Sequence, residues 1–378
     1  MAATVSIKAP INGAVLRWAR ESIGIAPERA AKRANVATDI YKKWESGEDV
    51  PSMPRLRKLA NLFKRPLPVF FLPHLPQSPP LPKDFRKPAV IIKQPLGEAS
   101  LMAVRKARWY QTVAKELMVD LGYQVRSLKV PELKSIPLAD IINDIRKLDI
   151  HKQMSWENNW EALKRWRMYL EEQGIFVFQF PMPVEESRGF SLVREEHPPV
   201  IVISSQDSPN GRIFTLFHEY CHILLEDSAL CIPSEAIDIG QRDVEKFCNE
   251  FAGNFLVPTR HLKESIKESQ FSKIEDIITV LSKKFIVSQF VILRRLYSEK
   301  EIDYKDYQRL FKELQKGVKK VESAGGNFYK NQYAEKGKRF IGLVVEAESS
   351  KKITLSRALD YLGIKTRHYD QIVNMLYE

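Results

Sequence analysis

A chemically suggestive group of residues lies at 218–222, where the chain reads His-Glu-Tyr-Cys-His inside an apolar run. Side chains four residues apart share one face of a helix, so His218 and His222 can bind the same metal ion. Glu219 follows the first histidine and can reach a water molecule beside that ion. This HExxH spacing is typical of a zinc hydrolase.

A catalytic zinc ion takes three protein ligands, so the two histidines need a partner. The metzincin pattern would place Gly at 225 and His at 228, but the chain has Leu225 and Ser228, which excludes that class. A carboxylate from a following helix is the other common solution. Glu245 fits best because apolar residues at helical spacing follow it, and Glu250 is the alternative.

The stretches FTLFHEYCHILLE (214–226) and EKFCNEFAGNFLVP (245–258) together resemble the ImmA/IrrE family of metallo-endopeptidases. The resemblance implies zinc ligands at His218, His222 and Glu245, and a catalytic base at Glu219. It also implies that Asn249, one turn after Glu245, orients a ligand. Cys221 departs from the family, which usually has Gly or another small residue there.

Composition indicates a soluble globular protein of two or three domains: the chain has 378 residues, 44% hydrophobic and 28% charged. No apolar run is long enough to cross a bilayer, and the first residues lack the pattern of a secretory signal. The three cysteines are odd in number and form no CxxC pair, which argues against a disulfide framework. We therefore expect a cytoplasmic protein with no membrane partner.

Positive charge is concentrated near the N-terminus. The formal net charge is +12, and residues 1–80 contain 13 Lys and Arg against 6 Asp and Glu, so 13 − 6 gives +7. More than half of the excess therefore lies in about a fifth of the chain, which favours a polyanionic partner for this region.

Residues 11–72 show the spacing of four or five short helices. Gly24 ends the first, Pro27 can open the second, and Asn35 can end it. The pattern around the alanine pair, together with Trp44-Glu45-Ser46-Gly47, resembles the helix-turn-helix of the phage-repressor (XRE) class. The resemblance implies duplex DNA binding through 11–72, with 38–43 as the recognition helix. The implied DNA contacts comprise base-reading residues Thr38, Asp39, Tyr41 and Lys42, and phosphate-contacting residues Lys32, Arg33 and Lys43.

The remaining chain suggests an α+β fold that is mainly helical. Helices are expected at 101–121, 138–147 and 156–173, and short strands at 175–180, 189–193 and 200–204. After Pro258 the pattern is helical, including a second helix-turn-helix-like pair within 273–298. We expect a helix-turn-helix domain at 1–72, a proline-rich linker at 73–90, a gluzincin-like metallopeptidase core at 91–260 and a helical C-terminal region at 261–378.

These patterns favour a zinc-dependent endopeptidase coupled to a DNA-binding module. The family resemblance implies that its substrate is a transcriptional repressor or an antitoxin-like protein. One alternative is a DNA-binding regulator that keeps the metal fold as a sensor or partner-binding surface without cleaving. Another is a component of a toxin-antitoxin module.

Overall fold

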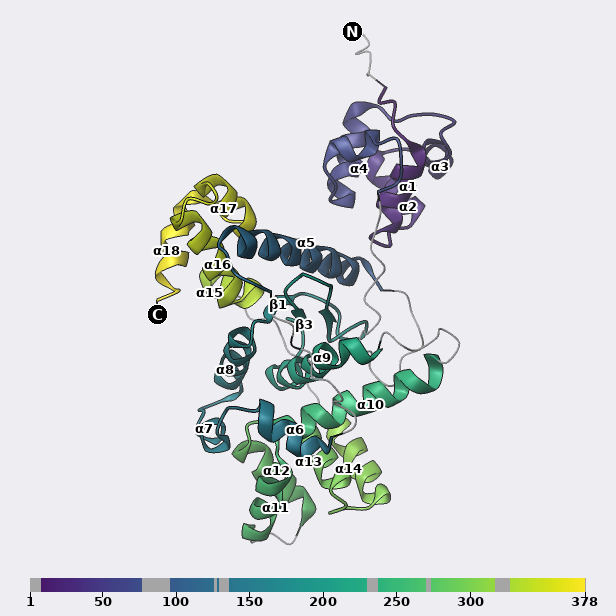
Figure 1. Ribbon diagram of the computed structural model, residues 1–378. Helices are drawn as coiled ribbons and strands as arrows, with labels where there is room; N and C mark the ends of the chain where they lie inside the picture. The colour runs from purple at the N-terminus through teal and green to yellow at the C-terminus, as the bar shows by residue number, and fades with distance from the viewer. Residues whose placement is uncertain are drawn as a thin grey trace. The chain divides into compact units, whose positions relative to one another are not determined.

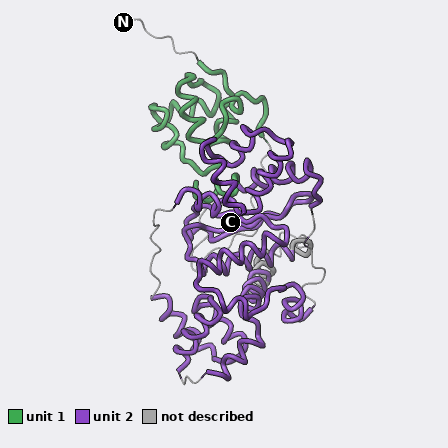
Figure 2. The backbone as a smooth tube through the Cα atoms, turned by 90° about the vertical axis from the view of Figure 1, so that its left-hand side faces the viewer, with its two compact units in different colours: residues 1–81, 90–106 green, residues 82–89, 107–378 purple. Residues whose placement is uncertain are grey.

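The structure is a computed structural model that describes residues 8–76, 96–125, 128, 136–229, 237–269, 273–316 and 327–377. For residues 226–243 no side chains are described. The chain divides into two compact units, one of residues 1–81 and 90–106 and the other of residues 82–89 and 107–378 (Figure 2). Most of the expected linker, and Cys231, lie outside the described residues. Within the described residues, no helix is long and apolar enough to cross a membrane.

The first unit is a bundle of short helices packed around small residues. Ala30, Ala31 and Ala34 are buried, which lets neighbouring helices approach closely. Asn35 has a left-handed conformation with φ of 54° and ends one helix, as its sequence position predicted. The helices are α1 (Gly13–Glu21), α2 (Pro27–Ala34), α3 (Thr38–Ser46), α4 (Met53–Phe63) and the 3₁₀-helix η1 (Leu67–Phe71).

The second unit contains a three-stranded sheet with the order β1-β3-β2. β1 (Phe176–Phe180) runs parallel to β3 (Val200–Ser204), and β2 (Gly189–Leu192) runs antiparallel to β3. All three expected strands are confirmed: β1 begins one residue later and β2 ends one residue earlier than expected, and β3 has the expected bounds. The five residues of β1 and of β3 are buried, because helices cover both faces of the sheet.

The two faces of the sheet hold different side chains. Val177, Ile201 and Ile203 belong to a large core that includes residues of α8 (Asn159–Glu172) and α9 (Pro209–Ala229). On the other face, the ring of Phe178 lies 5.0 Å from that of Tyr110 and 5.7 Å from that of Phe340. Those rings come from α5 (Glu98–Asp120) and α16 (Lys338–Ser349) (Figure 1).

The predicted helix at 156–173 begins later than expected. The side chain of Asn158 accepts hydrogen bonds from the main-chain N–H groups of Trp160 and Glu161, so this residue caps α8 and the helix starts at Asn159. A separate helix precedes it, α7 (Ile150–Met154). The other helix of this region is α6 (Leu138–Ile145).

Helices make up the rest of the second unit, as expected. Of these, α10 (Ile237–Leu256) packs against α9, and α12 (Ile274–Lys284) with α13 (Gln289–Ser298) forms the expected helix-turn-helix-like pair. The remaining elements are α11 (Thr259–Glu268), α14 (Tyr304–Lys316), α15 (Phe328–Lys336), α17 (Leu355–Leu362), η3 (Thr366–His368) and α18 (Tyr369–Asn374).

Candidate metal centre

The HExxH residues lie near the middle of α9, a helix that is apolar on almost every side. His218 and Glu219 are fully buried, and His222 is 6% exposed. Leu216, Phe217 and Leu224 pack into the surrounding core. A helix that is hydrophobic all round belongs inside a protein, and its polar residues must then find partners there.

The start of α9 is fixed by Arg212. This buried guanidinium donates hydrogen bonds to the main-chain oxygen of Asp207 over 2.7 Å and to Oε1 of Gln179 over 3.0 Å. It also donates to the main-chain oxygen of Ser205. Arg212 therefore ties the helix to β1 and to the loop after β3, which is a structural role.

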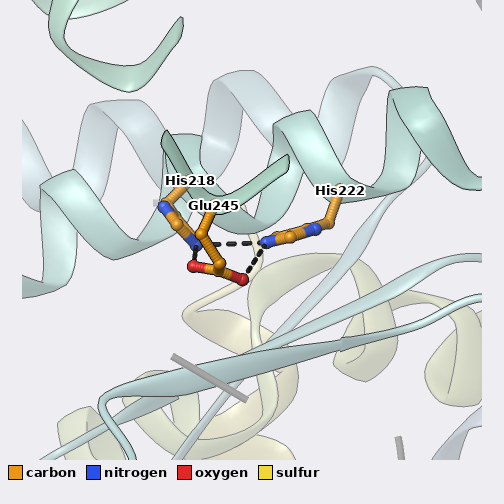
Figure 3. A group of neighbouring side chains, drawn as sticks. All are labelled: His218, His222 and Glu245. Atoms are coloured by element: carbon orange, nitrogen blue, oxygen red, sulfur yellow. Dashed lines mark hydrogen bonds and ion pairs between the residues drawn. The ribbon is translucent and has the colours of Figure 1, made fainter. Parts of the chain in front are cut away.

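Three donor groups converge where α9 meets α10 (Figure 3). The Nε2 atoms of His218 and His222 lie 3.1 Å apart. The carboxylate of Glu245 spans both, with Oε2 at 3.1 Å from Nε2 of His218 and Oε1 at 3.2 Å from Nε2 of His222. All three ligand atoms lie within 4.8 Å of one another.

The protonation of this cluster follows from its contacts. Burial alone would raise the pKa of Glu245, but hydrogen bonds from His218 and His222 outweigh it and hold that pKa well below its usual range. Burial alone would lower the pKa of His222, but its hydrogen bonds with Cys248 and Glu245 raise that pKa well above the ordinary value. Two imidazoles thus share one carboxylate anion.

This donor set fits a zinc ion. Four ligands at ~2.0–2.1 Å around a tetrahedral metal lie about 3.3 Å apart. The two Nε2 atoms lie 3.1 Å apart, and each lies 3.1 or 3.2 Å from its nearer carboxylate oxygen, which is close to that spacing. Two imidazole nitrogens and one carboxylate also match the ligand chemistry of a catalytic zinc site with one open position. The donor types and their spacing therefore suit such an ion.

Two further residues of α10, Glu250 and Asn249, were expected to act at the metal. Glu250, the alternative third ligand, is not part of the cluster and lies near the guanidinium of Arg295 instead. Asn249 is half-buried, one turn after Glu245. Its expected part in orienting a ligand stays a prediction.

Glu219 has a hydrogen-bond partner that the sequence did not suggest. The hydroxyl of Ser191, in β2, donates to Oε2 of Glu219 over 3.1 Å. The strand approaches α9 closely because it contains Gly189, where an added Cβ would lie 2.5 Å from the methyl group of Thr215. A serine in a short strand carries no signal of such a contact.

The thiol of Cys248 contacts the metal cluster from α10. It lies close to His222 and to Cys221 of α9, and both thiols are buried. Burial raises the pKa of Cys248 well above its usual value. Two small residues therefore lie where α9 meets α10, and one of them also lies beside a histidine of the cluster.

Comparison with known families agrees with this geometry. Residues 170–297 match the peptidase family profile described as the IrrE N-terminal-like domain. The chain contains an IrrE-type peptidase domain. His218, Glu219, His222 and Glu245 all lie within the matched range, as does Ser191. No curated protein matches the chain.

A second match covers residues 16–70, described as a helix-turn-helix. The resemblance to ImmA/IrrE proteins with an XRE-type module is therefore confirmed. The IrrE-type domain belongs to a metallopeptidase family, which implies a metal ion, and the helix-turn-helix is a DNA-binding module.

Six of the seven predicted DNA contacts lie at least partly exposed in the first unit. Asp39, Lys42 and Lys43 are exposed on α3, and Thr38 is half-buried at its start. The expected phosphate contacts on α2 are exposed as well, namely Lys32 and Arg33.

The prediction for Tyr41 was wrong. This residue is fully buried, and its hydroxyl donates to Oε1 of Glu45 over 2.8 Å. Glu45 is buried too and pairs with Arg20. Tyr41 therefore belongs to the core of the bundle, and it cannot reach the major groove.

Proposed function

We propose that this protein is a zinc-dependent endopeptidase coupled to a DNA-binding module, and that it cleaves a transcriptional repressor or antitoxin-like protein to control gene expression. The observation that carries the proposal is the convergence of His218, His222 and Glu245 beside the buried carboxylate of Glu219. The IrrE-type match supports the peptidase class.

His218, His222 and Glu245 would hold the zinc ion. When bound, zinc supplies Lewis acidity, which acidifies a water molecule and polarises the scissile carbonyl. Glu219 takes the proton from the attacking water and delivers it to the leaving amine. The buried setting strengthens these electrostatic interactions, because little solvent screens them.

The substrate would bind as an extended segment along β2. Among the described residues, β3 is the only strand that pairs with β2, so the other edge of β2 pairs with no described strand. An extended peptide can add to such an edge through main-chain hydrogen bonds. Since Ser191 in β2 contacts Glu219, a segment bound there would lie beside the base.

The decisive experiment co-incubates the zinc-loaded protein with the product of the adjacent gene and follows the intact mass of that product. We expect cleavage that stops with a chelator and resumes with added zinc. Glu219→Gln should retain zinc and lose about 10²–10⁴-fold in rate, because it removes the general base and keeps the ligands.

Glu250→Gln is the matched control, since it makes the same chemical change on α10 outside the cluster. It should cleave like the wild type. Cleavage that survives metal removal, or a Glu219→Gln variant that cleaves at the wild-type rate, would contradict the peptidase assignment.

The helix-turn-helix match favours a second candidate, a DNA-binding regulator that binds a partner through the metal fold without cutting it. In that case Glu219→Gln would leave control of the neighbouring promoter unchanged. A toxin-antitoxin role would instead appear as growth arrest on expression, relieved by the adjacent gene product.

A further inference from the structure

We propose that Ser191 is a positioning residue for Glu219, and that it sets the orientation of the base relative to a substrate bound on β2. This inference rests on the proposed peptidase function. Its starting point is the hydrogen bond of 3.1 Å from the Ser191 hydroxyl to Oε2 of Glu219, which joins a strand to the centre of α9.

The strand register places the Ser191 side chain on the α9 face of the sheet. Ser191 lies opposite Ile201, which packs in the same core as the apolar residues of α9. Gly189, on the same face, permits close contact between β2 and Thr215 of α9. The distance between strand and helix is therefore fixed by packing, and the hydroxyl of Ser191 is held at hydrogen-bonding distance from Glu219.

The main chain of Ser191 faces the edge of β2 that pairs with no described strand. The N–H of Ser204 donates to the oxygen of Arg188 over 2.8 Å, so these two residues form a hydrogen-bonded pair. Bonded and non-bonded pairs alternate in an antiparallel ladder, so Ser191 and Ile201 form a non-bonded pair. The N–H and C=O of Ser191 then point away from β3, toward a segment added to the edge.

Ser191 thus offers two separable functions. Its main chain can pair with the substrate, and its hydroxyl holds one oxygen of the base. A carboxylate held at one oxygen keeps a defined orientation, and small errors in the placement of a reacting group are costly. Loss of the hydroxyl should therefore lower kcat and leave KM nearly unchanged, because the main-chain contacts remain.

The test is a double-variant cycle in the full-length, zinc-loaded protein, with acetohydroxamate as the probe. A hydroxamate that binds at the zinc site places a polar group next to the base, so its affinity reports the position of Glu219 and needs no protein substrate. We expect Ser191→Ala to weaken acetohydroxamate binding about tenfold, the loss typical of a hydrogen bond to a charged group. In a Glu219→Gln background the same change should have little further effect.

Ser191→Thr keeps the hydroxyl and should restore affinity to near the wild-type value. Ser204→Ala is the matched control, because it removes another hydroxyl of the same sheet, one that donates to the main-chain oxygen of Met182. It should lower thermal stability and leave the affinity of the zinc-loaded protein unchanged. With the protein substrate of the preceding experiment, Ser191→Ala should lower kcat about tenfold at nearly constant KM.

Equal acetohydroxamate affinities for Ser191→Ala and the wild type would overturn the proposal. So would an effect of the same size in the Glu219→Gln background, since the serine would then act without the base. Failure of the wild type to bind zinc is a different result: it would overturn the proposed function, and the positioning role with it.

Discussion

Arg20 and Glu45 form a doubly hydrogen-bonded ion pair inside the helix-turn-helix. Nε of Arg20 lies 2.7 Å from Oε1 of Glu45, and Nη2 lies 2.9 Å from Oε2. Tyr41 donates to the same carboxylate, and both charged side chains are almost fully buried. The pair joins α1 to α3, so it helps to fix the orientation of α3, the helix for which DNA contacts are predicted.

Glu45→Gln should destabilise the first unit by about 3 kcal/mol, because it removes the buried counter-ion of Arg20 and leaves only the exposed Glu21 beside that charge. Hydrogen exchange of the amides in α1 and α3 measures the effect. Glu48→Gln makes the same chemical change at an exposed position and should leave exchange unchanged. Equal protection in the two variants would show that the buried pair contributes little.

The exposed lysines of α3 give a prediction for DNA binding. A lysine that neutralises a phosphate releases condensed counterions, so the association constant for DNA falls as salt concentration rises. The slope of the logarithm of this constant against the logarithm of salt concentration becomes shallower by about 0.9 for each phosphate contact that is lost. The double change Lys42→Ala with Lys43→Ala should weaken binding to duplex DNA and flatten this slope by up to about 2. Fluorescence anisotropy across a salt series measures it.

The matched control is Lys305→Ala with Lys312→Ala, which removes the same charge from exposed positions of α14. Its slope should equal that of the wild type. If both double variants shift the slope alike, the effect comes from net charge and α3 has no special part in binding.

Arg295 and Glu299 support the end of α10, the helix that carries Glu245. The buried Arg295 donates to the main-chain oxygen of Val257 over 3.0 Å and to Oε1 of Glu299 over 2.9 Å. Burial by itself would raise the pKa of Glu299, but hydrogen bonds from Thr259, Lys263 and Arg295, together with the charge of Arg295, lower it. The ionised form of Glu299 therefore stabilises the folded state.

This lowered pKa predicts a pH-dependent stability difference. The contribution of Glu299 to the free energy of unfolding is fully present above the pKa of the unfolded state, about 4.5. This contribution is lost as the pH falls through the lower pKa of the folded state. Glu299→Gln should lower the free energy of opening of α13 by about 1–2 kcal/mol at pH 7, and the difference should vanish well below pH ~4.5. Hydrogen exchange between pH 3.5 and 7 tests this, with the exposed Glu301→Gln as control. A difference that grows on acidification would contradict the assignment.

Sequence patterns predicted the parts of the site that depend on spacing within a single helix. His218 and His222 share a face because a helix has a fixed pitch, and the apolar run around them requires such a helix to be buried. Glu245 was favoured over Glu250 from the spacing of apolar residues on its own helix. The structure brings Glu245 to the two histidines, because that face of α10 packs against α9.

Contacts between distant elements could not be predicted in this way. Ser191 meets Glu219 only because β2 pairs with β3 in one register and approaches α9 at Gly189. Tyr41 was expected in the DNA groove by analogy of position, but the burial of Glu45 and Arg20 draws its hydroxyl inward. Both outcomes depend on tertiary packing, which a single sequence does not encode in its local spacing.

Cys248 gives the last prediction, which concerns metal affinity. Its thiol lies close to His222, whose Nε2 faces the carboxylate of Glu245. Groups that hold a ligating imidazole typically change metal affinity by 10–100-fold when they are removed. Cys248→Ala should therefore weaken zinc binding about tenfold, as measured by competition with a chromophoric chelator.

Two variants separate this effect from a change in packing. Cys248→Ser keeps a hydrogen-bonding group and should bind zinc more tightly than Cys248→Ala. Cys221→Ala removes a thiol of similar burial from α9. It should weaken zinc binding less than Cys248→Ala, because Cys221 contacts Cys248, whereas Cys248 is the residue beside His222. If Cys248→Ala binds zinc as tightly as the wild type, the thiol only fills space between the helices, and His222 is oriented by the packing of α9 alone.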